Sequence, residues 1–165
     1  RIAWNQDNYI SLFVLYQRIV SQRYSLALCY LTVFLEELAM FNHVMVGAND
    51  IDESKHFYDA VLGALGISPG VKDLEVRCRY HGNSGVFMIK VPINGEPATS
   101  GNGSTIGFAA KNSAAVDTWH ASGVANGGTT CEDPPGVRNS GKYKVYLAYL
   151  RDPAGNKVCA AYRMG

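Results

Sequence analysis

The sequence predicts an α+β fold assembled from two copies of one strand–helix–hairpin unit, with an extra N-terminal helical segment. Three observations predict it. A strand of alternating apolar residues leads directly into a helix at two places, in residues 41–50 and again in residues 105–112. Each predicted helix is followed by short β-forming runs that Gly- and Pro-containing turns separate. Residues 1–39 differ from the rest, since they contain neither Gly nor Pro and are rich in Leu, Tyr, Ile and Val.

The N-terminal segment, residues 1–39, is predicted to be helical because its apolar residues recur at helical spacing, at Tyr24, Leu28, Leu31, Leu35 and Leu38. Its apolar run is shorter than the roughly 20 residues that a bilayer-spanning helix needs, so no membrane span is expected. Two interpretations remain open. The segment is a helical arm that covers the domain or a dimer partner, or it lies upstream of a natural start at Met40 and is not native.

The two copies of the unit, about residues 40–98 and 103–163 of a domain over residues 40–165, are offset by about 62 positions. Corresponding residues do the same physical job as alternate strand residues, as helix caps or as large aromatics. The aligned pairs are Val44 and Ile106, Val46 and Phe108, Ala48 and Ala110, Asp50 and Asn112, and Phe57 and Trp119. One such sheet leaves an apolar face and its edges open, so the two copies are expected to pair.

Each helix has a predicted beginning and a predicted buried side. Asp50 caps the first helix, with Glu53 three residues on, and Gly66 and Pro69 end it. Its core-facing residues are Ser54, Phe57, Tyr58, Val61, Leu62 and Leu65. Asn112 or Ser113 caps the second helix, whose buried residues are Ala115, Val116 and Trp119.

The remaining strands are predicted as hairpins. In the first copy they cover about residues 73–81 and 84–91, so this copy is one strand short or has a cramped one. In the second copy they cover about residues 127–134, 142–150 and 156–163. Residues 92–103, which contain several Gly and Pro, are the crossover between the copies.

Composition excludes several classes of partner. The chain has 165 residues and a net charge of +1 without a clustered basic run, so neither a nucleic acid nor an anionic membrane is expected as a partner. The four cysteines lie far apart, at positions 29, 78, 131 and 159. This spacing favours free thiols in a reducing cytoplasm over a disulfide framework.

Two motifs carry a resemblance to a known family. One is the strand and helix cap Phe41-Asn42-His43-Val44-Met45-Val46-Gly47-Ala48-Asn49-Asp50, and the other is the tight turn Arg151-Asp152-Pro153-Ala154-Gly155-Asn156. Together they resemble the vicinal oxygen chelate superfamily, the glyoxalase/bleomycin-resistance/dioxygenase group, over about residues 40–163. The resemblance implies two βαβββ repeats whose paired sheets form an open, curled mixed sheet around a ligand cavity. We expect a homodimer.

Strand alternation then sorts residues by face. With Val44 and Val46 under the helix, His43 and Met45 are expected to point into the cavity, as are Thr105 and Gly107 in the second copy. On the last strand Cys159 faces the cavity. Tyr149 belongs to a tyrosine-rich strand of which one face lines an aromatic cleft. The predicted cavity-lining set is His43, Met45, Thr105, Gly107, Cys159 and Tyr149, and no catalytic residue is assigned.

Metal-dependent relatives use four side chains, a mix of His and Glu, to hold a metal that binds neighbouring oxygens of the substrate. By the resemblance, the first ligand position falls on His43, the second near Ile89 or Lys90, the third on Thr105 and the fourth on Cys159. Only His43 retains the ligand type of the family, and specific binding of a divalent ion needs three or more protein ligands. No cofactor is therefore expected, although a redesigned metal site that includes His43 and Cys159 remains an alternative.

These residues support two functions. The first is a metal-free protein that binds a small molecule in the cavity, as the antibiotic-resistance members of the superfamily do. The alternative is a metal-dependent glyoxalase-like lyase or isomerase that acts on a small oxygenated substrate.

Overall fold

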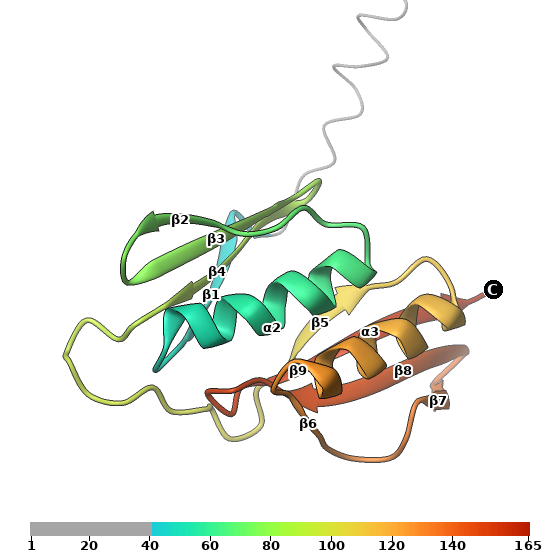
Figure 1. Cartoon of the computed structure of the whole chain (residues 1–165). Coiled ribbons are helices and arrows are strands. Elements are labelled where there is room, and N and C mark those ends of the chain that lie inside the picture. Colours follow the sequence, from blue (N-terminus) through green and yellow to red (C-terminus); the bar gives the residue numbers. More distant parts are fainter. Residues whose placement is uncertain (1–40) are drawn as a thin grey trace, which may run out of the picture. The chain divides into compact units, whose positions relative to one another are not determined.

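Two β-sheets and two helices make up residues 41–165, the part of the chain that this computed structural model describes (Figure 1). The predicted helical segment over residues 1–39 lies outside the described residues and stays a prediction. Each half of residues 41–165 has the order strand, helix, strands, so the α+β class and two repeats of the βαβββ type are confirmed, the second with one additional short strand. Neither helix is long and apolar enough to cross a membrane.

The first sheet has the strand order β1-β4-β3-β2. Its strands are β1 (His43–Gly47), β2 (Val71–Leu74), β3 (Arg77–Gly82) and β4 (Gly85–Lys90). β1 runs parallel to β4 because helix α2 (Ile51–Ala64) carries the chain between β1 and the rest of the sheet. The strand predicted over residues 73–81 divides into β2 and β3, with a register irregularity between Lys72 and Leu74. The cramped strand of the first copy is therefore β2.

The second sheet has the strand order β5-β9-β8-β6, and β7 also pairs with β8. Its strands are β5 (Ile106–Ala109), β6 (Thr129–Thr130), β7 (Gly136–Ser140), β8 (Tyr143–Arg151) and β9 (Lys157–Met164), and helix α3 (Ser113–Ala125) follows β5. β5 is parallel to β9, as β1 is to β4. The strand predicted over residues 127–134 is shortened to β6, since the chain then turns through Pro134 and Pro135.

Both helices begin at the predicted caps. The Asp50 carboxylate accepts hydrogen bonds from the amides of Asp52 and Glu53, at 2.8 and 2.9 Å. The Asn112 side chain accepts one from the amide of Ala115, at 2.8 Å. These bonds satisfy donors that the first helical turn leaves without a partner.

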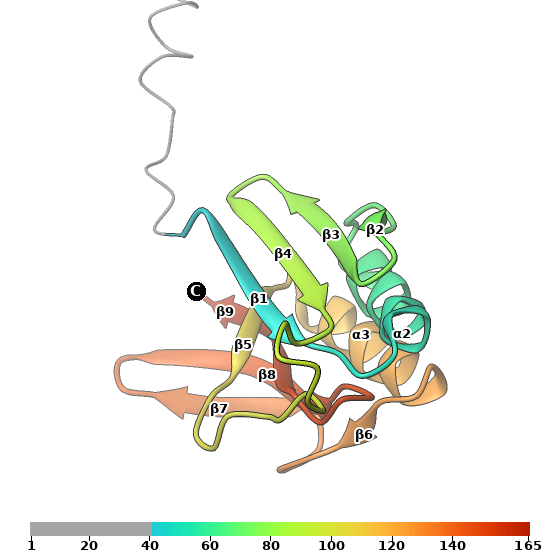
Figure 2. The ribbon, with the colours of Figure 1, turned by 90° about the vertical axis from the view of Figure 1, so that its left-hand side faces the viewer.

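A single core joins the two repeats. Helix α2 packs on β3 and β4, α3 packs on β8 and β9, and the two helices pack against each other. The helices thus lie where the two sheets face each other (Figure 2). Phe57, Tyr58 and Trp119 are fully buried in this core, with Ile89 of the first sheet and Leu150 of the second.

The two sheets are separate hydrogen-bonded ladders within residues 41–165, and neither closes into a barrel. The helices cover one face of each sheet and leave the opposite face, called here the outer face, uncovered by a helix. On the outer face of the first sheet, Met45 is 42% exposed and lies beside Met88. Helix–helix packing keeps the two outer faces apart, so within one chain they do not close around a common cavity.

Candidate functional site

An open pocket of about 650 Å³ lies at one end of the sheets and is lined by two of the predicted residues, His43 and Gly107. It is called here the aromatic pocket, because four aromatic rings contribute to it. The remaining lining comes from the β3–β4 hairpin, the end of α2 and the strand β5. The aromatic lining residues are Phe41, Tyr80, Phe87 and Phe108.

The rings of the aromatic pocket support one another across the two sheets. Phe87 of β4 meets Phe108 of β5 edge to face, with ring centroids 5.2 Å apart. Tyr80 lies 6.1 Å from Phe87. Such pairs stabilise beyond the area that they bury, so the wall between the sheets is firmly packed.

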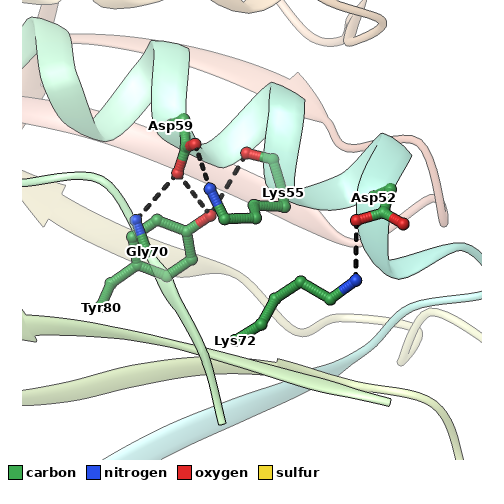
Figure 3. Close-up of polar contacts among 6 residues, drawn as sticks. All are labelled: Asp52, Lys55, Asp59, Gly70, Lys72 and Tyr80. Carbon is green, nitrogen blue, oxygen red and sulfur yellow. Dashed lines mark hydrogen bonds and ion pairs between the residues drawn. The ribbon is translucent and has the colours of Figure 1, made fainter. Parts of the chain in front are cut away.

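A polar network fixes Tyr80 against helix α2 (Figure 3). The Tyr80 hydroxyl donates to the Asp59 carboxylate at 3.1 Å, and that carboxylate also accepts from the amide of Gly70 at 2.9 Å and from Lys55 Nζ at 2.5 Å. Burial raises the pKa of Tyr80, and the neighbouring Cys78 and Asp59 raise it further. Burial would also raise the pKa of Asp59, but its hydrogen bonds from Lys55 and Gly70 outweigh this effect and lower it.

His43 is exposed at the start of β1, and its Nδ1 atom lies 3.0 Å from the side-chain oxygen of Asn42. His81 also lines the aromatic pocket. In the register of the first sheet both histidines pair with Val86, which lies between them. The pocket therefore combines apolar rings with two imidazoles, a composition suited to a small molecule that has an apolar body and a few polar atoms.

The other four predicted residues lie away from the aromatic pocket. Met45 is on the outer face of the first sheet. Cys159 and Tyr149 are register neighbours on the outer face of the second sheet, and Cys159 also pairs with Gly107. Thr105 lines a separate, smaller pocket. The structure thus brings His43 and Gly107 into one pocket and leaves the rest of the set outside it.

The environment of Cys159 disfavours a reactive thiolate. The residue is 8% exposed, and burial raises the pKa of its thiol. The nearby Lys157 ammonium acts in the opposite direction without overcoming the effect of burial. A thiol in such surroundings is a poor nucleophile at neutral pH.

The residues at the family's metal positions do not fit a divalent ion. Ile89 is fully buried in the core, and Lys90 is a cation. Thr105 and Cys159 fill the third and fourth positions, which leaves His43 as the one residue of the ligand type that the family uses. Across residues 41–165 no three side chains of His, Cys, Asp or Glu come together closely enough to hold a metal.

The Asp152-Pro153-Ala154-Gly155-Asn156 turn has a structural role that its sequence does not reveal. Asp152, only 4% exposed, accepts hydrogen bonds from the hydroxyl of Tyr58 at 2.8 Å and from the amide of Asn156 at 2.8 Å. The Asn156 side chain donates to Asp152 and also to the carbonyl oxygen of Gly47 at the end of β1. The turn therefore fastens the second repeat to β1 and α2 of the first.

Sequence reasoning missed most of the aromatic pocket. Alternation and the repeat assign Phe108 to the helix-covered face, and in the structure it packs against the core that contains Phe87. The pocket opens where α2 ends and the strand ends stay uncovered, so residues from both faces of a strand line it. The repeat itself was the available indication, since Phe108 occupies in the second copy the place of Val46 in the first.

The two repeats, each with a helix on one face of its sheet, define the class of protein. A family model described as the Glyoxalase/Bleomycin resistance protein/Dioxygenase superfamily matches residues 40–160, and the chain belongs to this family. The predicted resemblance is therefore confirmed.

Solved structures agree with this assignment. A glyoxalase/bleomycin resistance protein from Albidiferax ferrireducens T118 is 60% identical, with a TM-score of 0.73 over 75% of this chain and 99% of that one. A glyoxalase/bleomycin resistance protein/dioxygenase family enzyme from Burkholderia phytofirmans PsJN is 19% identical, with a TM-score of 0.59 over 74% of this chain and 98% of that one. The second likeness supports the fold alone. No curated protein matches the chain.

Proposed function

We propose that this protein is a metal-free member of the family that binds a small molecule. The observation that carries the proposal is the donor set, in which His43 alone remains of the four ligand positions. The family's metal polarises substrate oxygens as a Lewis acid, which is chemistry that this set of side chains is not built to recruit. The residues of the aromatic pocket remain able to bind and orient a ligand.

The aromatic pocket is the proposed binding site. Its volume of about 650 Å³ falls within the range of about 300–1,000 Å³ that is usual for small-molecule sites. Phe87 and Phe108 offer apolar surface, and the two imidazoles of His43 and His81 offer polar contacts at the mouth. A flat molecule with a small number of polar atoms matches this composition.

We further propose that the protein is a homodimer whose second copy covers the outer face of the first sheet. Met45 is 42% exposed and Val71 is 61% exposed on this face, so the face offers apolar side chains that a second copy could cover. Because the helices keep the two outer faces of one chain apart, covering them requires another chain. Such a dimer allows Met45, Cys159 and Tyr149 to line a cavity between copies.

The dimer has a direct test. Met45→Lys should convert the protein to a monomer in sedimentation velocity, because a buried unpaired ammonium is costly. The control is Val124→Lys on α3, where the replaced side chain is 48% exposed and belongs to a helix instead of the outer face of the first sheet. A dimer that survives Met45→Lys and dissociates with Val124→Lys contradicts the proposed interface.

The binding function is tested by a thermal-shift screen of small aromatic molecules on metal-free protein. Hits should lose their stabilising effect in His43→Ala and keep it in His56→Ala, a control in which an exposed histidine on α2 is removed outside the pocket. The alternative function, a metal-dependent lyase, rests on the retained His43. It requires a stoichiometric metal that His43→Ala abolishes, and this result would replace the present proposal.

A reducing cytoplasm is the proposed location. Cys78, Cys131 and Cys159 have free thiols, and Cys78 and Cys159 are buried as small apolar side chains. This usage is typical of proteins that are not stabilised by disulfides.

A further inference from the structure

A second pocket, called here the polar pocket, lies between the loop that joins the repeats and the beginning of β9. It has a volume of about 370 Å³ and is lined by residues 100–105, Arg151 and Lys157. Arg151 ends β8 and Lys157 begins β9, where the two residues are register partners. Ile106 pairs with Val158, so the preceding residue of β5, Thr105, comes beside Lys157.

The lining of the polar pocket is rich in hydrogen-bond donors. Arg151 donates one guanidinium N–H to the carbonyl oxygen of Gly155 at 2.8 Å, which holds the side chain at the turn. It takes part in none of the ion pairs among residues 41–165, so its charge is available to a ligand. The loop adds the hydroxyl groups of Ser100 and Thr105, whereas the Ser104 hydroxyl already donates to the carbonyl oxygen of Gly101 at 2.9 Å. The amides of residues 101–103 donate to no other described residue.

The second cation is held in place by its neighbours. Lys157 forms an ion pair with Glu132, and its ammonium lies 4.6 Å from the centre of the Tyr149 ring. Glu132 has a φ of 62°, a left-handed conformation that costs energy for a residue other than glycine. With Arg151, Lys157 and Glu132 counted together, the polar pocket keeps one net positive charge.

We propose that the polar pocket binds a tetrahedral oxyanion, a phosphate or phosphonate group. A guanidinium beside an ammonium, with hydroxyl and amide donors around them, offers more hydrogen bonds than a carboxylate can accept. Gly-rich loops also let backbone amides approach an anion closely. Thr105 lines the polar pocket, whereas Ile106 lines the aromatic pocket; because successive strand residues face opposite sides, the two pockets are separate sites.

This inference goes beyond the proposed binding function, because the polar pocket is a site separate from the aromatic pocket. Its ligand class is a small molecule that carries a doubly charged oxyanion. Glu132 competes with that oxyanion for Lys157, so its removal should increase affinity.

The test is calorimetric titration of the full chain with inorganic phosphate at low ionic strength, with acetate as the carboxylate comparison. Phosphate should bind saturably and acetate should not. Arg151→Gln should weaken phosphate binding about tenfold, which is the size expected for losing one charge-assisted contact. Glu132→Gln should tighten it. The matched control is Arg163→Gln, since Arg163 lies farther along β9 over the ring of Tyr143 and outside the pocket.

Three outcomes would overturn the inference: no saturable phosphate binding, equal losses in Arg151→Gln and Arg163→Gln, or weaker binding in Glu132→Gln. If Arg151→Gln does not fold, the inference is tested by NMR titration of the unmodified protein. Phosphate should shift the amide resonances of Gly101 and Gly103, and acetate should not. Failure of the inference is separable from failure of the proposed function. If aromatic molecules stabilise the protein in a His43-dependent way but phosphate does not bind, only the oxyanion site is refuted. If phosphate binds but no aromatic molecule stabilises the protein, only the aromatic pocket is refuted.

Discussion

The hydrogen bond from Tyr58 to Asp152 offers a quantitative test of how the two repeats are held together. Both side chains are buried, with Tyr58 fully so and Asp152 4% exposed, and the bond measures 2.8 Å. Tyr58→Phe removes the hydroxyl and leaves the ring, so the packing of the core stays close to native. A hydrogen bond to a charged group contributes about 1.5–3 kcal/mol, and we expect a loss of that size in the free energy of unfolding.

The assay is urea unfolding followed by circular dichroism, fitted as a two-state transition. Tyr162→Phe is the control, because Tyr162 packs against the same core and its hydroxyl forms no hydrogen bond with the other residues in 41–165. It should change stability by less than about 0.5 kcal/mol. Equal effects of the two substitutions would refute the role given to Asp152, since the loss would then come from the tyrosine rings and not from the bond between repeats.

Three further predictions follow from buried or crowded positions. Burial, and after it the neighbouring Asp152, raises the pKa of Tyr58, so its contribution to stability should be complete below the ordinary tyrosine pKa and be lost as the pH rises above it. In Tyr58→Phe the free energy of unfolding should therefore fall less steeply with pH in the alkaline range. The pKa of Asp59 is lowered, so its stabilising effect should be present above the ordinary aspartate pKa and lost on acidification, and acid unfolding of Asp59→Asn should depend less steeply on pH than that of the parent protein. Gly123→Ala would place its Cβ 2.2 Å from a methyl carbon of Leu150 and should lower the free energy of unfolding in urea by about 1–3 kcal/mol. The control Gly63→Ala in α2 meets nothing within 4 Å and should be neutral or stabilising by up to about 1 kcal/mol; the reverse order of effects would contradict the packing described.

Local features of the fold could be predicted because they depend on residues near one another in the chain. Asp50 and Asn112 are the helix caps, as their side chains and positions indicate, and Trp119 lies in the core of the second repeat. Alternation also sorts β1 and β9 correctly into a helix-covered face and an outer face. The division of residues 73–81 into β2 and β3 was missed because Glu75 and Val76 are not typical turn residues.

The arrangement of the two sheets could not be predicted from the same patterns. Both a curled single sheet and two sheets on either side of a helix pair bury the same strand faces, so alternation does not distinguish them. The choice depends on contacts between distant residues, such as Phe87 with Phe108 and α2 with α3. The same contacts place the aromatic pocket at the strand ends, which is why His43 and Gly107 meet there while Met45, Cys159 and Tyr149 do not.

The most direct test of the metal-free binding function is elemental analysis of the full chain after purification without chelators and after reloading with nickel, zinc, manganese and iron. The donor set predicts less than a stoichiometric amount of every metal, with the same content in the parent protein and in His43→Ala. One tightly held metal ion per chain that disappears in His43→Ala would contradict the account and establish His43 as part of a working metal site.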